Sequence, residues 1–311
     1  MSVLAAPGPT GFDEILRSQR PSGAFPSTVT LRGGARDDEN AFVTALVTLE
    51  LLPYRRIDIV RAGCRRALDF LLSCEAADRP GAFCFYPRTT DHSWMGERLP
   101  PDVDDSALCT LALVRAGRRR ARFARRVLEV VLRSQRLRRI SPAAPAWLRP
   151  GVYATWLSSQ RAVNPVDLCV NVNVITLISE VGLRAEHPVA PIVAMIEEGL
   201  SLVETQPSLW PLMLPYYPHP RELCFALRRA VAAGVPELET TLARAERSAW
   251  SRAAELAPVC SSMGGLASWT SAPLALARRH AARRAVDEEA GRAEERCSRR
   301  HPDLEPREGA M

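Results

Sequence analysis

The chain has 311 residues, 47% of them hydrophobic and 24% charged, which is enough to bury a sizeable core. This composition argues against a largely disordered chain, and no apolar run reaches the roughly 20 residues that cross a bilayer. The net charge is +6, and every basic side chain is arginine. The densest stretch, RAGRRRARFARR (Arg115–Arg126), has no RNA- or DNA-binding motif beside it, so nucleic acid is not an expected partner.

Eight cysteines are spread along the chain, and no two of them form a CxxC pair. No secretory signal peptide stands at the start. Most of the cysteines lie in apolar runs, where cysteine behaves as a small core residue. We therefore expect reduced thiols and a cytoplasmic protein.

A repeated pattern begins after the first ten residues, which we expect to be loose. ILRSQRPSGAFPS (Ile15–Ser27) has an apolar helix end, a polar bend and a glycine followed by an aromatic residue. The same order recurs in residues 70–88 and, more weakly, in residues 131–156. The copies therefore follow one another roughly every 60 residues, which indicates a repeat architecture.

Each copy continues into a second helix that an acidic residue opens, at Asp37, Asp104 and Asp167. Residues 209–234 and 261–284 fit two further units less closely. Paired amphipathic helices must stack on their neighbours to bury their apolar faces. We therefore predict an all-α fold, a single α/α toroid over residues 11–282 with one helix of each pair lining a central cavity, followed by a charged tail over residues 283–311.

The most unusual stretch is LPPDVDDSALCTLALVRAG, in which Asp102, Asp104 and Asp105 precede an apolar helical run. One aspartate is sufficient to cap a helix. Like charges this close raise the proton affinity of at least one carboxyl. A carboxyl that stays protonated at the wall of an apolar cavity is a candidate Brønsted acid.

DVDDSA resembles the DxDD motif of class II terpene cyclases, the protonation-initiated group that includes squalene-hopene cyclases. The glycine-aromatic turns are similar to the QW repeats of those enzymes, with phenylalanine in place of tryptophan. The resemblance implies a toroid fold and an isomerase- or lyase-type reaction without a cofactor or metal. It also implies that Asp104 donates a proton to an isoprenoid or prenylated substrate, while Asp102 and Asp105 hold that proton in its reactive orientation.

Carbocations formed in such a reaction are stabilised by aromatic rings. The candidate rings in the loops are Trp94, Tyr153, Trp156, Trp210, Tyr216, Tyr217 and Trp269. A second polar cluster, which includes Asp167 and Asn171 one helical turn apart, is expected to bind a polar head group or orient the acid. The related cyclases combine two such domains, which leaves open a partner domain or a homodimer that completes this one. A peripheral membrane contact also stays open.

Two alternatives remain at the sequence level. Asp167 and Cys169 resemble the Asp-x-Cys zinc ligands of protein prenyltransferase β subunits, with His219 as a third ligand. A zinc-dependent prenyltransferase-like reaction would use this site, and Mg²⁺ would enter if the substrate carries a diphosphate. The other alternative is a helical-repeat scaffold that binds a protein through a concave face and has no catalytic role.

Overall fold

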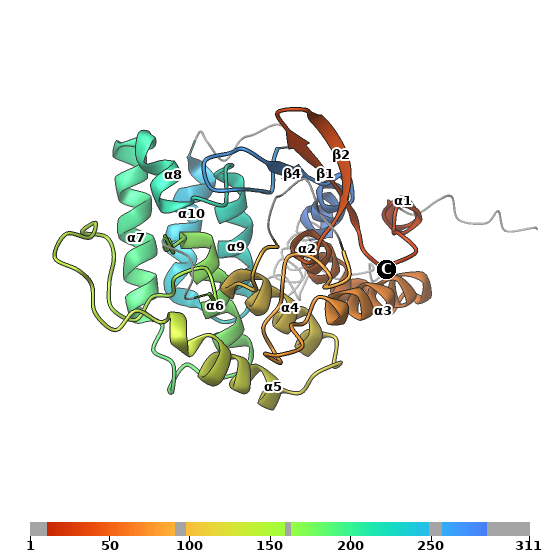
Figure 1. The fold of residues 1–311 in the computed structure, drawn as a ribbon, viewed down its shortest axis with the longest axis horizontal. Coiled ribbons are helices and arrows are strands. Elements are labelled where there is room, and N and C mark those ends of the chain that lie inside the picture. Colours follow the sequence, from red (N-terminus) through yellow and green to blue (C-terminus); the bar gives the residue numbers. More distant parts are fainter. Residues whose placement is uncertain (1–10, 91–97, 159–162, 249–256, 285–311) are drawn as a thin grey trace, which may run out of the picture.

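A four-stranded antiparallel sheet accompanies the helices in the computed structural model, which describes residues 11–90, 98–158, 163–248 and 257–284 (Figure 1). The prediction of an all-α toroid of the terpenoid cyclase and protein prenyltransferase type is therefore wrong, and the fold is mixed α/β. No helix in the described ranges has the length and apolar character needed to cross a membrane.

The sheet joins the two ends of the described chain. In sheet order, its strands are β2 (Gly34–Glu39), β1 (Pro26–Leu31), β4 (Ser268–Thr270) and β3 (Cys260–Ser261). A tight turn after Leu31 connects β1 to β2, and Gly34 there has a φ of 118°, which favours glycine. The alternating, β-branched sequence of β1 and the two glycines that follow it are the hairpin signal that the helical interpretation overlooked.

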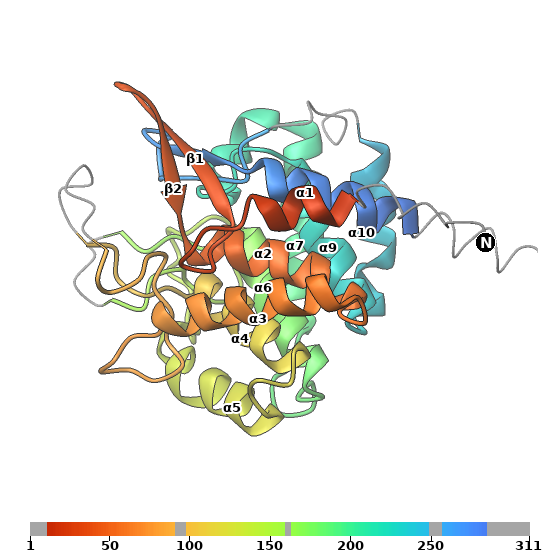
Figure 2. The ribbon, with the colours of Figure 1, turned by 90° about the vertical axis from the view of Figure 1, so that its right-hand side faces the viewer.

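Helices form the rest of the fold. In chain order they are α1 (Gly11–Arg17), α2 (Ala41–Leu51), α3 (Asp58–Ser73), α4 (Val103–Arg115), α5 (Ala121–Arg126), α6 (Leu168–Glu180), α7 (Ala190–Thr205), α8 (Trp210–Met213), α9 (Arg221–Ala232), α10 (Glu239–Arg247) and a helix over 272–284. Helices α2, α4, α6 and α9 pack side by side in that order, and α3, α7 and α10 pack against α2, α6 and α9, respectively. The sheet stands at the end of α2 where that helix begins (Figure 2).

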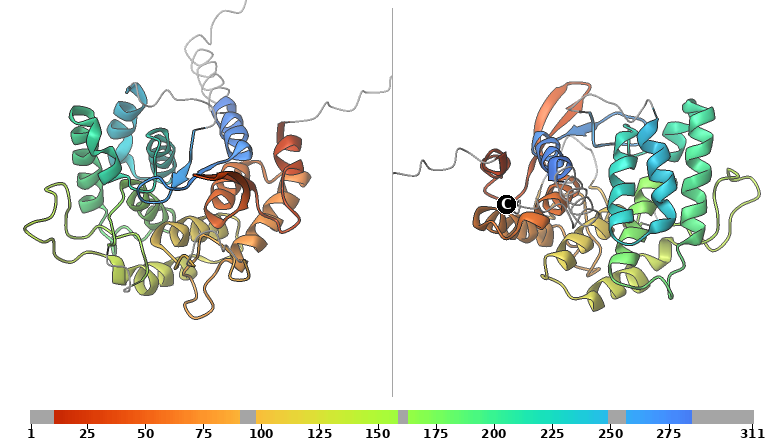
Figure 3. Two further views of the ribbon diagram at one scale, coloured as in Figure 1. Left: turned by 45° about the horizontal axis from the view of Figure 1, so that its top comes forward. Right: turned by 180° about the vertical axis from the view of Figure 1, so that it is seen from behind.

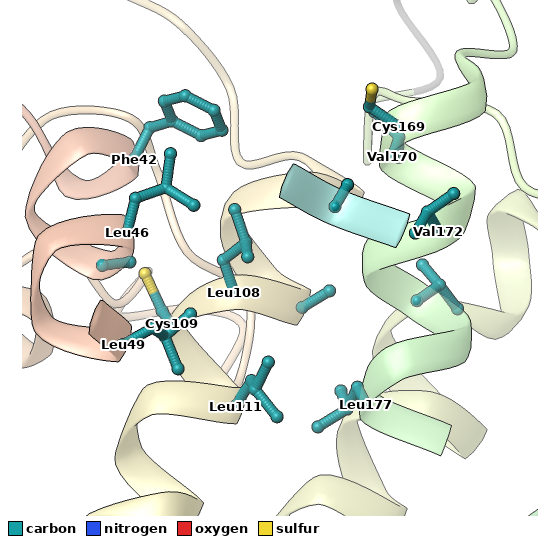
Figure 4. Packing of buried hydrophobic residues seen from close by; sticks show 14 of the residues in the cluster. Phe42, Leu46, Leu49, Leu108, Cys109, Leu111, Cys169, Val170, Val172 and Leu177 are labelled. Carbon is teal, nitrogen blue, oxygen red and sulfur yellow. The ribbon is translucent and has the colours of Figure 1, made fainter. Parts of the chain in front are cut away.

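The core lies between α2, α4 and α6, which are buried over most of their surface. Figure 4 shows their facing side chains, with Phe42 and Val170 near one end of the helices and Leu49, Leu111 and Leu177 near the other. These three helices therefore run in the same direction. Helices with apolar residues on all sides are suited to the centre of a domain, whereas α3 and α9 bury only one face.

Each glycine-aromatic turn is attached to the first turn of the inner helix that follows it. Gly23, Gly81 and Gly151 have φ angles of 96°, 92° and 101°, a conformation that favours glycine. Two residues later, the aromatic backbone N–H donates to a side-chain oxygen of the helix. The pairs are Phe25 with Thr44 Oγ1 at 3.2 Å, Phe83 with Ser106 Oγ at 2.9 Å and Tyr153 with Asn171 Oδ1 at 2.8 Å. These bonds hold the repeated turns against the helix starts.

The start of α2 differs from the expectation. Asp37 was expected to open this helix, but it lies in β2, and Asn40 caps α2 by accepting the N–H of Val43 at 2.8 Å. The reason is the hairpin, which takes the acidic residues into a strand. The N-caps Asn40, Asp102 and Asp167 are thus the equivalent positions of the three repeats.

Asp38 connects the sheet to the helices. This buried carboxylate accepts hydrogen bonds from Asn40 Nδ2 at 2.7 Å, Tyr86 Oη at 3.0 Å, and Ser27 Oγ and Trp269 Nε1 at 3.1 Å each. The donors come from β1, β4, the cap of α2 and the loop after α3. Because a buried carboxylate needs such donors, this network specifies how the sheet meets the helix starts.

A buried ion pair attaches the helix over 272–284 to α9. Arg278 donates to both carboxylate oxygens of Glu222, at 2.6 and 2.7 Å, and its guanidinium carbon lies 3.8 Å from the centroid of the Phe225 ring. The two side chains are only 8% and 5% exposed, so water cannot solvate the charge of one side chain if the other is removed.

We predict that Arg278→Met lowers the free energy of unfolding by about 3–5 kcal/mol, because it leaves the Glu222 carboxylate buried without its partner. Arg228→Met is the matched control, since Arg228 pairs with Glu246 at 2.6 Å on the surface and its loss should cost less than about 1 kcal/mol. Urea unfolding measures both values. Equal losses in the two variants would contradict the prediction.

Candidate active site

A cavity of about 470 Å³ lies between the N-terminal ends of α2, α4 and α6 and the sheet. Figure 3 (left) shows the strands of the sheet, in red and blue, crossing the middle of the molecule in front of helices. Apart from the three carboxylates of the DVDD stretch, most of the lining is apolar or aromatic. Pockets of this size and character bind small organic ligands.

Six aromatic side chains line the cavity, although aromatic residues make up only 6% of the chain. They are Phe42, Phe85, Trp156, Tyr216, Tyr217 and Trp269. The rings contact one another mainly edge to face, as in Phe85 with Trp269, whose centroids are 5.2 Å apart. Trp156 Nε1 also donates to Tyr216 Oη at 2.6 Å, which keeps its polar edge bonded. The cavity therefore presents several aromatic surfaces to a ligand.

Asp102 begins α4. Its Oδ1 accepts the backbone N–H of Asp105 at 2.7 Å, and its carbonyl oxygen accepts from Ser106 Oγ at 2.5 Å. The sequence predicted Asp104 as the residue that opens this helix, and the structure places the cap two residues earlier, at Asp102, because the carboxylate of Asp102 is the one that accepts the N–H of the first turn. Burial and the neighbouring charge of Asp104 raise the pKa of Asp102 to about 7.

Asp104 lies at the cavity wall and is 7% exposed. Its Oδ1 accepts from Asn173 Nδ2 at 2.7 Å, and its Oδ2 is bonded to Tyr217 Oη. Burial raises the pKa of Asp104, while the bonds from Tyr217 and Asn173 and the charge of Arg229 act in the opposite direction. Burial thus favours the protonated form of Asp104, and the two hydrogen-bond donors favour its ionised form.

Asp105 is 1% exposed, and neither of its carboxyl oxygens has a hydrogen-bond partner in the described part of the chain. Burial and the charges of Asp102 and Asp104 raise its pKa well above the ordinary range. A buried carboxylate without donors is strongly disfavoured, so the site favours the protonated form of Asp105. The expectation that this cluster exceeds what capping needs agrees with this geometry, since capping uses one carboxyl oxygen of Asp102.

Four other predicted binding residues lie outside the cavity lining: Tyr153, Asp167, Asn171 and Trp210. Asp167 caps α6 and accepts backbone N–H groups from Cys169 at 2.8 Å and, through its other oxygen, from Tyr216 at 3.2 Å. Asn171 donates to the Tyr153 carbonyl at 2.9 Å. These residues therefore hold the loops behind the wall and do not meet a ligand in this cavity. Trp94 lies outside the described residues.

The proposed zinc ligands are engaged in other contacts. Both Asp167 oxygens accept backbone N–H groups, and Cys169 is fully buried in the core, where burial raises its pKa well above the ordinary range. His219 Nδ1 accepts the N–H of Arg221 at 3.2 Å. The described ranges contain no group of three histidine, cysteine or acidic side chains arranged to hold a metal ion.

Phe42, Phe85 and Arg229 belong to the site but are not among the residues that the sequence predicts. Phe42 follows the cap of α2, and Phe85 follows the second glycine-aromatic turn, so their positions in the repeat were the available signal. Arg229 gave no signal, because nothing local distinguishes it from the many other arginines of the chain.

Comparisons of this chain with family models, curated proteins and solved structures find no match. The evidence on function is therefore the geometry of the cavity and the residues around it. That geometry defines a class of site, in which clustered, buried carboxyls face an aromatic cavity.

The raised pKa of Asp102 predicts a pH dependence of stability. The folded protein holds a proton up to about pH 7, whereas the unfolded chain releases it near 3.8, so the free energy of unfolding should fall as pH rises between these values. Asp102→Asn retains a capping oxygen but does not titrate. Urea unfolding at several pH values should therefore give a shallower slope for the variant, with a difference of roughly a few kcal/mol over the window. Parallel curves would show that Asp102 does not carry the effect.

Proposed function

We propose that this protein is a protonation-initiated cyclase that acts on an isoprenoid or prenylated substrate in the aromatic cavity, with Asp104 as the general acid. The observation that carries the proposal is the position of a buried carboxyl, held by Tyr217 and Asn173, at the wall of a cavity lined by aromatic rings. The resemblance of DVDDSA to the DxDD motif supports the same assignment.

The first step transfers a proton from Asp104 to one carbon of an alkene. The π electrons of the alkene form the new C–H bond, a carbocation remains on the other carbon, and Asp104 becomes a carboxylate. The π electrons of a second double bond then close a ring, and loss of a proton ends the reaction. Burial raises the pKa of Asp104 and so favours its protonated form before this step, and the donors from Tyr217 and Asn173 stabilise the carboxylate after it.

The aromatic lining supplies the second requirement of this chemistry. Carbocations are attracted to the faces of aromatic rings, and the attraction is larger where water is excluded. The cavity offers rings from α2, from the loop before α9 and from β4. We assign Asp102 and Asp105, which lie beside Asp104 at the start of α4, the role of holding its proton in the reactive orientation.

The cytoplasm is the compartment we propose for this reaction. The seven cysteines of the described ranges are all free and buried, as expected for reduced thiols. A partner domain, a second copy of the chain or a peripheral membrane contact is compatible with the cavity, whose rim carries Val163 and Leu266 at 60% and 62% exposure.

Product analysis by chromatography and mass spectrometry tests the proposal. The protein is incubated with linear isoprenoid alcohols, hydrocarbons and diphosphates of several lengths. We expect a cyclised product from the parent protein and at least a roughly 100-fold lower rate from Asp104→Asn, because the amide cannot donate the proton. Asp58→Asn is the matched control, since Asp58 also lies at a helix start but is exposed on α3.

Circular dichroism confirms that the variants are folded. An Asp104→Asn variant with the parent rate would refute the role of the acid. Turnover that EDTA abolishes and Zn²⁺ restores would favour the prenyltransferase-like alternative. No turnover by any of the proteins would instead favour the scaffold alternative.

A further inference from the structure

A chain of buried polar groups runs from α9 to the acid. Arg229 Nη2 donates to Asn173 Oδ1 at 2.8 Å, and Asn173 Nδ2 donates to Asp104 Oδ1 at 2.7 Å and to Tyr217 Oη at 3.2 Å. Asn173 is 1% exposed and lies in the middle of α6, where the other side chains are mostly apolar. Arg229 and Asn173 do not line the cavity.

The arginine fixes the orientation of the Asn173 amide. A guanidinium donates hydrogen bonds and cannot accept them, so the amide oxygen has to face Arg229. The amide nitrogen then faces Asp104, and Oδ1 of Asp104 always receives an N–H. An oxygen that already accepts this bond is a poor place for the acid proton. Oδ2 instead faces the Tyr217 hydroxyl, which can donate to a carboxylate oxygen but can also accept the O–H of a protonated one, whereas the Asn173 N–H can only donate. The proton of Asp104 therefore belongs on Oδ2.

The same arginine brings a positive charge behind the acid. In the described ranges, the ionisable groups that interact with Asp104 are Asp102 at the cap of α4, Asp105 and Cys109 of α4, Asp167 and Cys169 at the start of α6, Tyr217 before α9, Cys260 of β3 and Arg229 of α9. Arg229 is the cation among them, and Glu50 at the end of α2 is the acidic group that acts on it. Its charge favours the carboxylate that Asp104 becomes after proton transfer.

We propose that Arg229 and Asn173 are positioning residues that confine the proton of Asp104 to Oδ2 and strengthen Asp104 as an acid. The proposal rests on the proposed function, in that it assumes Asp104 to be the proton donor. Neither residue touches the substrate. Tyr217 acts with these two residues. When the proton leaves Oδ2, the Tyr217 hydroxyl can donate its own hydrogen to that oxygen, so Oδ2 keeps a hydrogen bond to Tyr217.

The pH dependence of turnover distinguishes this role from a purely structural one. Arg229→Met removes the charge, so Asp104 should stay protonated to higher pH and be a weaker acid. We expect the alkaline limb of the pH profile of kcat to move up by about one pH unit or more, kcat at the plateau to fall about tenfold, and KM to change little. Arg229→Lys should restore part of both effects. Arg228→Met on the neighbouring, exposed position is the control and should match the parent.

Infrared spectroscopy tests the inference without any substrate. The protonated carboxyl band of Asp104, identified by its loss in Asp104→Asn, is followed against pH in the parent, Arg229→Met and Asn173→Leu. The band should persist to higher pH in both variants, and Arg229→Lys provides a folded alternative if either variant is unstable. An Asp104 band that titrates at the same pH in all variants would overturn the inference. Cyclisation is measured separately, so its absence with a shifted band would count against the proposed function alone.

Discussion

The clustering of carboxyls at the cavity depends on a single local interaction, the bond from the Asp105 backbone N–H to the Asp102 carboxylate. This bond begins α4 and places three carboxyls within its first turn. Asp102 is used in the cap, Asp104 is hydrogen-bonded at the wall of the cavity, and Asp105 also lines the cavity but is only 1% exposed. Because this turn is fixed, the three carboxyls cannot move apart. Burial raises the pKa of each, and the charge of neighbouring carboxyls raises it further for Asp102 and Asp105, so the protonated forms are favoured.

The acidic residues of the sequence indicated the start of α6 at Asp167 and that of α4 within the DVDD stretch, but not the start of α2, where Asn40 is the cap. Helix starts at Asp102 and Asp167 and a surplus of carboxyl groups at DVDD follow from local rules, because a cap involves residues only a few positions apart. Binding residues were harder to predict. Asp167 and Asn171 were predicted to bind a ligand, but both are hydrogen-bonded to the backbone. Asp167 accepts an N–H of the α6 start that has no partner within the helix, and Asn171 bonds to the backbone of the glycine-aromatic turn at Tyr153.

The sheet and the Arg229 contact could not be derived in the same way. β1 pairs with β4 through Val29 and Trp269, which are far apart in the chain, and no local pattern indicates which strand will be the partner. Arg229 of α9 contacts Asn173 of the neighbouring helix α6, and only the packing of these two helices distinguishes it from the other arginines. The helix-pair pattern was strong enough to hide the short strands, which led to the wrong all-α interpretation.

The pairing of β1 with β4 also determines when, during synthesis of the chain, the cavity can be completed. The helix starts that carry the carboxyls are complete once residues up to about Glu180 have been synthesised, but Trp269 and the rest of the far wall are not. Closing so long a loop is entropically costly and slow compared with forming neighbouring helices. On a chain still emerging from the ribosome, these carboxyls therefore lack their opposite wall, and the cavity is complete only when β3 and β4 have docked against β1.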